Sequence, residues 1–191
     1  VIDGCIELIR GDENCRGQVR EGVAEIGYAS QRMAAMADEL LVFAHRDGVD
    51  RESVDVGRLV AEMKKTLLQV VGGSVRLQLD VQPGAHRFCG NVTQTCQVLL
   101  NLVTNARDAL DGRGGVTVWA GCIEVHDPLR CRRLGLQPGA YTALSVRDNG
   151  CGIDPQHMPS IFDPFFTTKP EGHGIGLSTV YGIVRNSGGT V

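Results

Sequence analysis

Several features are scarce in this sequence, and each absence excludes a class of protein. No stretch approaches 18 consecutive apolar residues, so no membrane span is expected within it. Basic residues are not in excess: 19 lysines and arginines stand against 22 aspartates and glutamates, for a formal net charge of −3. A general nucleic-acid-binding surface needs a basic excess, so we expect no nucleic acid partner.

Paired cysteines and a signal peptide are also missing. The seven cysteines are an odd number, and no two of them have C-x-x-C spacing. Neither a zinc site nor a disulfide framework is therefore expected. No signal peptide opens the sequence, and together these features indicate a reduced, cytoplasmic compartment. Any membrane anchor of the intact protein is expected in segments upstream.

A long helix is predicted from Val19 to Ala44. The segment has no proline, and at about 1.5 Å per residue it would be about 40 Å long, more than a domain of roughly 135 residues needs to cover itself. Apolar or small residues recur at steps of four and three, typical of helices packed at a shallow angle: Val19, Val23, Ile26, Ser30, Met33, Ala37, Leu40 and Ala44. The alternative is a surface helix on the main core.

Residues 1–47 therefore form a predicted helical hairpin, with Ile2–Ile9 as the antiparallel partner and "RGDENC" as the turn. A two-helix core is too thin to stand alone, so we expect a homodimer in which a second copy completes a four-helix bundle. Both ends of the sequence look cut, the first within a helix and the last at the start of a strand.

Residues 48–53 are a predicted linker, and residues 54–191 are a predicted domain that lacks its C-terminal strands. Strands are expected at Val54–Val56, Val75–Val81, Gly115–Val125 and Tyr141–Arg147, and helices at Gly57–Val70, Gln94–Leu110 and Gly176–Asn186. The last two strands should pair as a hairpin, and residues 126–139, rich in arginine and proline, should form a loop. This pattern predicts an α+β fold, a two-layer sandwich with a mixed sheet.

The predicted helix 94–110 carries an unusual polar stripe. Asn101, Asn105 and Asp108 follow one another at spacings of four and three, so they lie on one side of the helix, opposite a broad apolar face. Their oxygens are hard ligands on one line, which suits a Mg²⁺ ion that also binds nucleotide phosphates. The alternative is a polar stripe that merely lacks charge.

Two segments near the C-terminus could cover an anion. Glycines 172, 174 and 176 lead into the predicted last helix, where backbone N–H groups and the helix dipole favour negative charge. No Gly-Lys-Ser/Thr follows, so this is not a Walker loop. Before it, "IFDPFFTTKP" (161–170) is either a core plug and a turn or the anchor of a flap, whose Lys169 could reach a phosphate.

The run "RDNGCGID" (147–154) allows two interpretations. Asn-Gly supplies the positive φ of a tight hairpin turn. A carboxylate followed by two spaced glycines also makes a small polar notch that a flat ring could enter. Asp148 is therefore a turn residue or a ligand-binding residue.

Taken in order, "NLVTNARDAL", "DNGCGI", "FDPFFTTK" and "GHGIGLS" resemble the N, G1, F and G2 boxes of sensor histidine kinases. These kinases belong to the gyrase/MutL/histidine-kinase superfamily, whose ATP-binding domain has the Bergerat fold. The resemblance covers about residues 54–191, and the upstream hairpin is similar to the family's dimerisation and histidine-phosphotransfer element. It implies a Bergerat-type two-layer α/β sandwich that binds ATP and Mg²⁺.

The resemblance also implies roles for single residues. Asn105 would hold Mg²⁺, and Asp108 would support the nucleotide end of the pocket. Asp148 would accept a hydrogen bond from the adenine amino group, which favours the ligand-binding interpretation of its motif. The other residues implied in ATP binding are Asn101, Gly150, Gly152, Ile153, Lys169, His173, Gly174, Ile175, Gly176 and Leu177. The two G1 glycines would let the ring approach, and His173 to Leu177 would line the triphosphate.

Three departures from the family pattern bear on activity. ATP-hydrolysing members carry a glutamate where this chain has Asn101, which fits the kinase branch, in which a histidine replaces water as the nucleophile. His173 stands where threonine is common. The phosphoacceptor motif, His-acid-x-x-Asn, is expected upstream of Val1, because His45 lacks the acidic partner and lies on the second arm of the hairpin.

The resemblance therefore implies a sensor histidine kinase that phosphorylates a histidine and passes the phosphoryl group to a response-regulator aspartate. This stretch alone is not expected to phosphorylate itself. The alternatives are an ATP-hydrolysing clamp of the gyrase/MutL kind and a non-catalytic dimeric scaffold that binds nucleotide.

Overall fold

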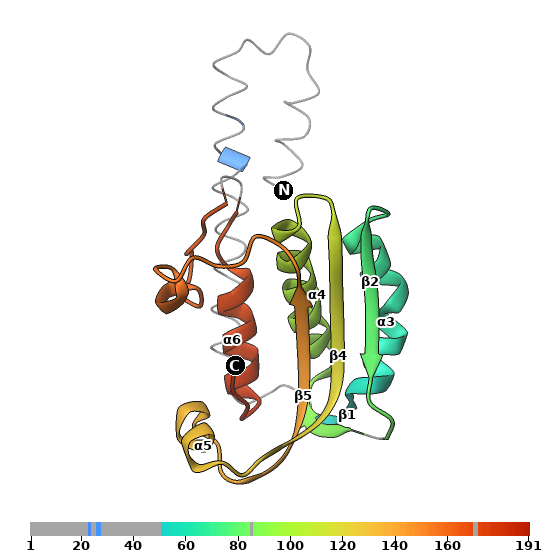
Figure 1. The fold of residues 1–191 in the computed structure, drawn as a ribbon, viewed down its shortest axis with the longest axis vertical. Helices are drawn as coiled ribbons and strands as arrows, with labels where there is room; N and C mark the ends of the chain where they lie inside the picture. Colours follow the sequence, from blue (N-terminus) through green and yellow to red (C-terminus); the bar gives the residue numbers. More distant parts are fainter. Residues whose placement is uncertain (1–22, 24–25, 28–50, 85, 170–171) are drawn as a thin grey trace. The chain divides into compact units, whose positions relative to one another are not determined.

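The computed structural model describes residues 23, 26–27, 51–84, 86–169 and 172–191 (Figure 1). The chain divides into two compact units, Val1–His45 and Arg46–Val191. In the first unit, Val23, Ile26 and Gly27 are described, and all three are helical. The predicted hairpin, its dimer surface and His45 otherwise lie outside the described residues, so those predictions stay predictions.

The second unit begins with a strand that runs directly into a helix. Strand β1 (Glu52–Asp55) is followed by helix α3 (Val56–Val71). The Asp55 side chain caps this helix by accepting a hydrogen bond from the Arg58 N–H at 3.0 Å. Gly72, at φ 76°, ends it in a conformation that suits glycine.

A three-stranded mixed sheet forms one layer of the domain. Strand β2 (Val75–Val81) pairs in parallel with β4 (Gly114–Val125), and β4 pairs antiparallel with β5 (Gly139–Asp148). The predicted hairpin of the last two strands is confirmed. A separate two-stranded sheet joins β1 to β3 (Arg87–Gly90), a short strand that the sequence pattern did not reveal.

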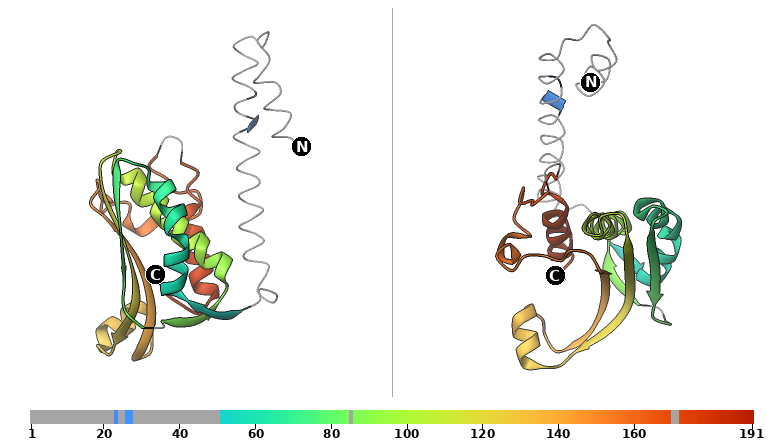
Figure 2. Two further views of the ribbon diagram at one scale, coloured as in Figure 1. Left: turned by 90° about the vertical axis from the view of Figure 1, so that its right-hand side faces the viewer. Right: turned by 45° about the horizontal axis from the view of Figure 1, so that its top comes forward.

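Helices form the other layer. Helix α4 (Val92–Ala109) packs between α3 and α6 (Gly176–Asn186), and the three lie along one face of the sheet (Figure 2). Helix α4 begins at Asn91, whose side chain accepts a hydrogen bond from the Gln94 N–H at 2.9 Å. The predicted α+β architecture with a mixed sheet is therefore confirmed.

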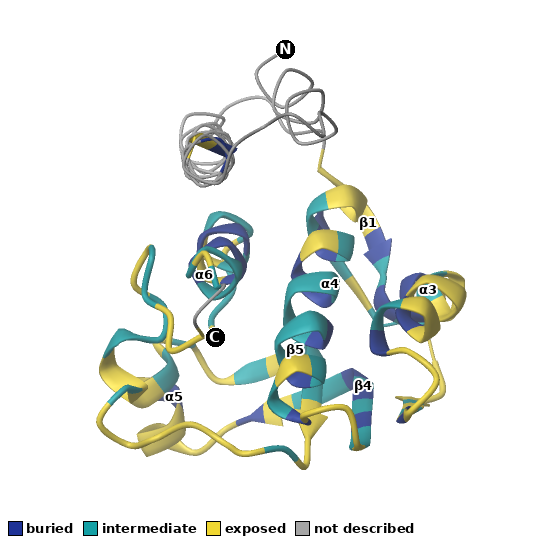
Figure 3. Cartoon of the chain, turned by 90° about the horizontal axis from the view of Figure 1, so that it is seen from above, coloured by how far each residue is buried: buried dark blue, intermediate teal, exposed yellow. Residues whose placement is uncertain are grey.

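The core lies between α3, α4 and the sheet (Figure 3). Val116 and Val118 of β4 alternate towards the helices and are fully buried, as are Leu67 of α3 and Leu99 and Val103 of α4. Because one side of α4 packs on this core, its other side is available for polar residues.

The prediction of a loop over residues 126–139 is wrong in part. Helix α5 (Pro128–Leu134) lies within it, between β4 and β5. Asp127 caps this helix, Pro128 occupies its first turn, and Gly135 ends it at φ 66°. Among the described residues, no helix is long and apolar enough to cross a membrane.

Candidate nucleotide site

The polar side of α4 faces the start of α6. The Asn101 side-chain amide donates to the backbone oxygen of Gly176 at 3.2 Å. Asn105 lies one turn further along α4, and a Cβ placed on Gly176 would lie 3.6 Å from its Nδ2 atom. Two of the residues predicted from the N box therefore lie against the helix that the G2 box begins.

A lysine from the F box reaches the same side of α4. The Lys169 ammonium lies 2.7 Å from Asp108 Oδ2 and 3.4 Å from Asn105 Oδ1. Its side chain is 41% exposed, and that of Asp108 is 29% exposed. Lys169, more than 60 positions from Asn105 and Asp108 in the sequence, thus makes a direct polar contact with each of them.

Asp108 is also held from the other side. Arg107 donates to Asp108 Oδ1 through Nε at 2.9 Å and through Nη2 at 2.6 Å. Partial burial alone would raise the pKa of Asp108, but the hydrogen bonds and charges of Lys169 and Arg107 outweigh burial and lower the pKa below its ordinary value. Asp108 therefore stays charged, with both oxygens engaged.

Asp148 is the last residue of β5. It pairs with the buried Val116 of β4, so its side chain lies on the helix-covered face of the sheet. Its Oδ1 accepts a hydrogen bond from the Gly150 N–H at 2.9 Å. No second strand follows this turn directly, so the segment is not the hairpin turn that Asn-Gly alone could indicate.

The loop after Asp148 is attached to the end of α4. The Cys151 N–H donates to the backbone oxygen of Ala109 at 3.0 Å. A Cβ on Gly150 would lie 2.6 Å from the Ala109 carbonyl carbon and closer still to its oxygen. Gly152, at φ 72°, and Ile153, 54% exposed, continue the loop in open space. Glycine is therefore required at position 150 because a side chain there would clash with the backbone at the end of α4.

The F and G2 boxes are joined to each other. The Phe165 N–H donates to the backbone oxygen of Gly174 at 2.9 Å, and the two residues have φ values of 68° and 67°. A Cβ on Gly174 would lie 2.7 Å from the Cα of Phe165, so glycine is needed at this position. The exposed His173 precedes this contact, and Ile175 follows it as the N-cap residue of α6.

The start of α6 suits an anion beside a cation site. Gly176 and Leu177 form its first turn, and Ile175 makes no side-chain cap. First-turn N–H groups have no partner within a helix and favour negative charge. Nearby, the oxygens of Asn105 and Asp108 hold the Lys169 ammonium, which shows that this position accepts a cation. The donor set fits Mg²⁺, which takes one or two protein oxygens together with phosphates.

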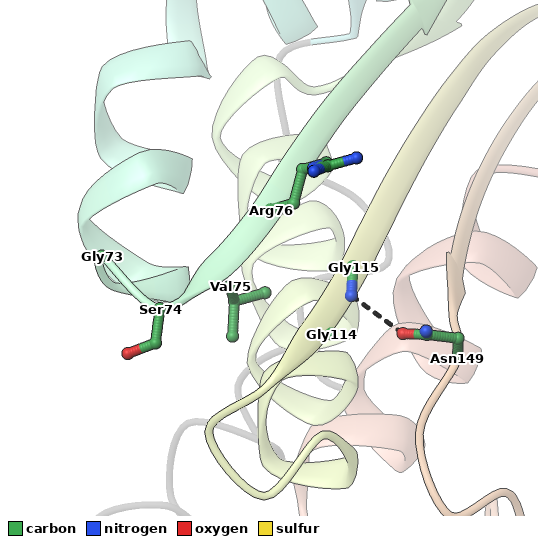
Figure 4. Close-up of a pocket in the computed structure, with 7 residues that line it drawn as sticks. All are labelled: Gly73, Ser74, Val75, Arg76, Gly114, Gly115 and Asn149. Atoms are coloured by element: carbon green, nitrogen blue, oxygen red, sulfur yellow. Dashed lines mark hydrogen bonds between the residues drawn. The ribbon is translucent and has the colours of Figure 1, made fainter.

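The sequence did not single out Arg107 or Asn149. Arg107 holds the Asp108 carboxylate in place. The sequence indicated this only by the position of an arginine directly before an aspartate. Asn149 Oδ1 accepts a hydrogen bond from the Gly115 N–H at 2.8 Å and lines an open pocket with Gly115 and residues 73–76 (Figure 4). None of the predicted site residues lines that pocket, so it is separate from the candidate nucleotide site.

Comparison with known proteins agrees with this arrangement. Residues 90–191 match the family described as histidine kinase-, DNA gyrase B- and HSP90-like ATPases. The chain is 32% identical over 171 residues to the sensor kinase CckA of Brucella abortus, which covers 88% of this chain and 18% of CckA. It is 30% identical over 196 residues to the sensory histidine kinase/phosphatase NtrB of Azospirillum brasilense, which covers all of this chain and 47% of NtrB.

Solved structures show the same fold. The mycobacterial sensor histidine kinase MprB superposes with a TM-score of 0.56 at 24% identity, covering 72% of this chain and 80% of that one. Full-length ShkA superposes with a TM-score of 0.59 at 21% identity, covering 97% of this chain and 37% of ShkA. The chain spans less than half the length of the two curated relatives named above. It belongs to the histidine kinase-, DNA gyrase B- and HSP90-like ATPases, in the branch of the sensor histidine kinases.

Proposed function

We propose that this chain binds Mg-ATP as the catalytic part of a sensor histidine kinase. The intact protein would transfer the γ-phosphoryl group to a histidine outside this chain, and then to an aspartate of a response regulator. One observation carries the proposal: Asn105 lies beside both the uncapped start of α6 and the Lys169 ammonium. An oxygen ligand, an anion site and a lysine ammonium meet at one place.

Each part of the site has a proposed role. Asp148 accepts a hydrogen bond from the adenine amino group, with Gly150, Gly152 and Ile153 beside the ring. The triphosphate lies along His173, Gly174, Ile175, Gly176 and Leu177. Asn105 is the metal ligand, and bound Mg²⁺ neutralises charge on the phosphates. The protein then contributes positioning and electrostatic stabilisation, as is general for phosphoryl transfer.

Asn101 favours transfer to histidine over hydrolysis. Hydrolysis gains roughly 10²–10⁴ in rate from a positioned base that takes a proton from water. Asn101 has an amide, which is no base near neutral pH, and it is already engaged with the Gly176 oxygen. We therefore expect slow phosphate release, unlike that of a hydrolysing clamp.

The remaining parts of the proposal concern organisation. Residues 1–47 belong to a dimerisation and phosphotransfer hairpin that forms a homodimer. The predicted linker over residues 48–53 is shorter than expected, because the ATP-binding domain already includes β1 from Glu52. The intact protein acts in the cytoplasm on the receiver domain of its response regulator, and this chain contacts neither nucleic acid nor membrane.

Calorimetric titration with ATP and Mg²⁺ tests the proposal. Asp148→Asn should weaken binding roughly tenfold or more, because it removes a charged acceptor from the adenine contact. Its remaining amide oxygen can still accept from Gly150, so the loop should keep its fold. Asp80→Asn, on an exposed position of β2, is the matched control and should bind as the wild type does. Unchanged affinity in Asp148→Asn would remove Asp148 from the adenine role.

A further inference from the structure

A positively charged side chain of the protein lies beside the residue proposed to bind the metal. The Lys169 ammonium lies 2.7 Å from Asp108 Oδ2 and 3.4 Å from Asn105 Oδ1, and Asn105 is the proposed Mg²⁺ ligand. An ammonium and a divalent cation repel each other strongly at such distances. A metal bound at the Asn105 oxygen would therefore drive the ammonium away from it.

The carboxylate that holds this lysine is itself fixed. Arg107 binds Asp108 Oδ1 through two nitrogens, and its third nitrogen, Nη1, donates to the backbone oxygen of Val70 at 3.3 Å. Val70 lies in the last turn of α3. Asp108 is thus tied to the end of a neighbouring helix, and its second oxygen is presented to Lys169.

We propose that Lys169 is a built-in cation that sets the metal dependence of nucleotide binding. Without nucleotide, its ammonium occupies the cation position between Asn105 and Asp108. When Mg-nucleotide binds, the metal takes Asn105 and the ammonium turns to the phosphates. This inference rests on the proposed function, because it assigns an order of cation exchange to the same site.

The chemistry of lysine suits such an exchange. Its ammonium is a point charge on a flexible four-carbon stem, with three donors that can be redirected. The Lys169 side chain is 41% exposed, and partly exposed ion pairs contribute little to stability. Release of Lys169 should therefore reduce nucleotide affinity by no more than about fivefold. The contact of Lys169 with Asp108 is strong enough to position the ammonium, and weak enough to be broken when the metal binds.

The first test needs no nucleotide. The chain has only three lysines, Lys64, Lys65 and Lys169, so amine acetylation followed by mass spectrometry resolves each one. Lys64 and Lys65 are exposed on α3 and serve as internal references. We expect Lys169 to react more slowly than both, and Asp108→Asn to remove that protection. Equal labelling of all three in the wild type would contradict the inference.

The second test compares ATP binding in Mg²⁺ and in EDTA. In Lys169→Met, binding in EDTA should weaken roughly tenfold or more, because no cation is left to meet the phosphates. The Mg²⁺ concentration for half-saturation should fall about two- to fivefold, because the competing ammonium is gone. Lys169→Arg should restore binding in EDTA, and Lys65→Met should behave as the wild type in both conditions.

The outcomes separate this inference from the proposed function. Equal weakening of Lys169→Met with and without Mg²⁺ would make Lys169 a simple phosphate ligand and contradict the exchange. Normal binding by Lys169→Met in both conditions would contradict it too. If the wild type bound no ATP at all, the proposed function would fail with it, while the labelling result would still report whether Asp108 holds Lys169.

Discussion

Replacement of Gly150 by alanine tests how the Asp148 loop is positioned. The added Cβ would lie 2.6 Å from the carbonyl carbon of Ala109 and 2.9 Å from its Cβ, so backbone has to move. Overpacking of this kind costs about 1–3 kcal/mol, and the adjacent hydrogen bond from Cys151 N–H to Ala109 O contributes about 0.5–1.5 kcal/mol. The expected loss is about 1.5–4.5 kcal/mol of unfolding free energy.

Urea denaturation measures this loss, and calorimetry should show weaker ATP binding, since Asp148 is two residues away. Gly182→Ala is the matched control. A Cβ there meets nothing within 4 Å, and the position is inside α6, so alanine should stabilise the helix by about 0.5–1 kcal/mol. A Gly150→Ala variant as stable as the wild type, with the same ATP affinity, would refute the argument that the end of α4 fixes this loop.

Three further predictions follow from named contacts. Leu99→Ala, at a fully buried core position, should lower the unfolding free energy by about 2–5 kcal/mol in the same denaturation assay, and a loss below about 1 kcal/mol would contradict the described core. Because the pKa of Asp108 lies below its ordinary value of 3.8, its stabilising effect should be fully present above about pH 3.8 and disappear as the pH falls through the lower native value. The difference in unfolding free energy between wild type and Asp108→Asn should therefore close at acid pH. A difference that widened there would mean that folding raises the pKa of Asp108 instead of lowering it. Asn105→Ala should weaken ATP binding in Mg²⁺ far more than in EDTA, and an equal effect in both would remove Asn105 as the metal ligand.

Periodicity was sufficient to predict the elements with strong patterns. Helix α6 and strand β2 have the predicted bounds, and the apolar face of α4 is the face that carries Leu99 and Val103 in the core. Helix α5 was missed because its seven residues are too few to show a period. Its end signals, an aspartate before Pro128 and a glycine at 135, were present in the sequence.

Strand β3 could not be predicted for a different reason. Its four residues, Arg87–Gly90, show no clear alternation, and they are ordered by pairing with β1, which lies more than 30 positions away. Such a strand forms because its partner strand is present, and the local sequence around β3 does not indicate which strand that is.

The candidate site was predicted as a set of residues and not as a set of contacts. The four motifs contained Asn105, Asp148 and Lys169, but nothing in their spacing placed Lys169 on Asp108. Glycine at 150 was expected to give room to a ring, and the structure shows that it first avoids the backbone of Ala109. Long-range contacts of this kind depend on the packing of whole elements, which a motif does not contain.

One measurement tests the central claim most directly: incubation of this chain with γ-labelled ATP and Mg²⁺, with bound nucleotide, free phosphate and labelled protein read from one sample. We predict saturable nucleotide binding, slow phosphate release because Asn101 is no base, and no stable label on His45. Rapid phosphate release would favour a hydrolysing clamp, a stable phosphohistidine at His45 would overturn the expected acceptor, and the absence of binding would contradict the account as a whole.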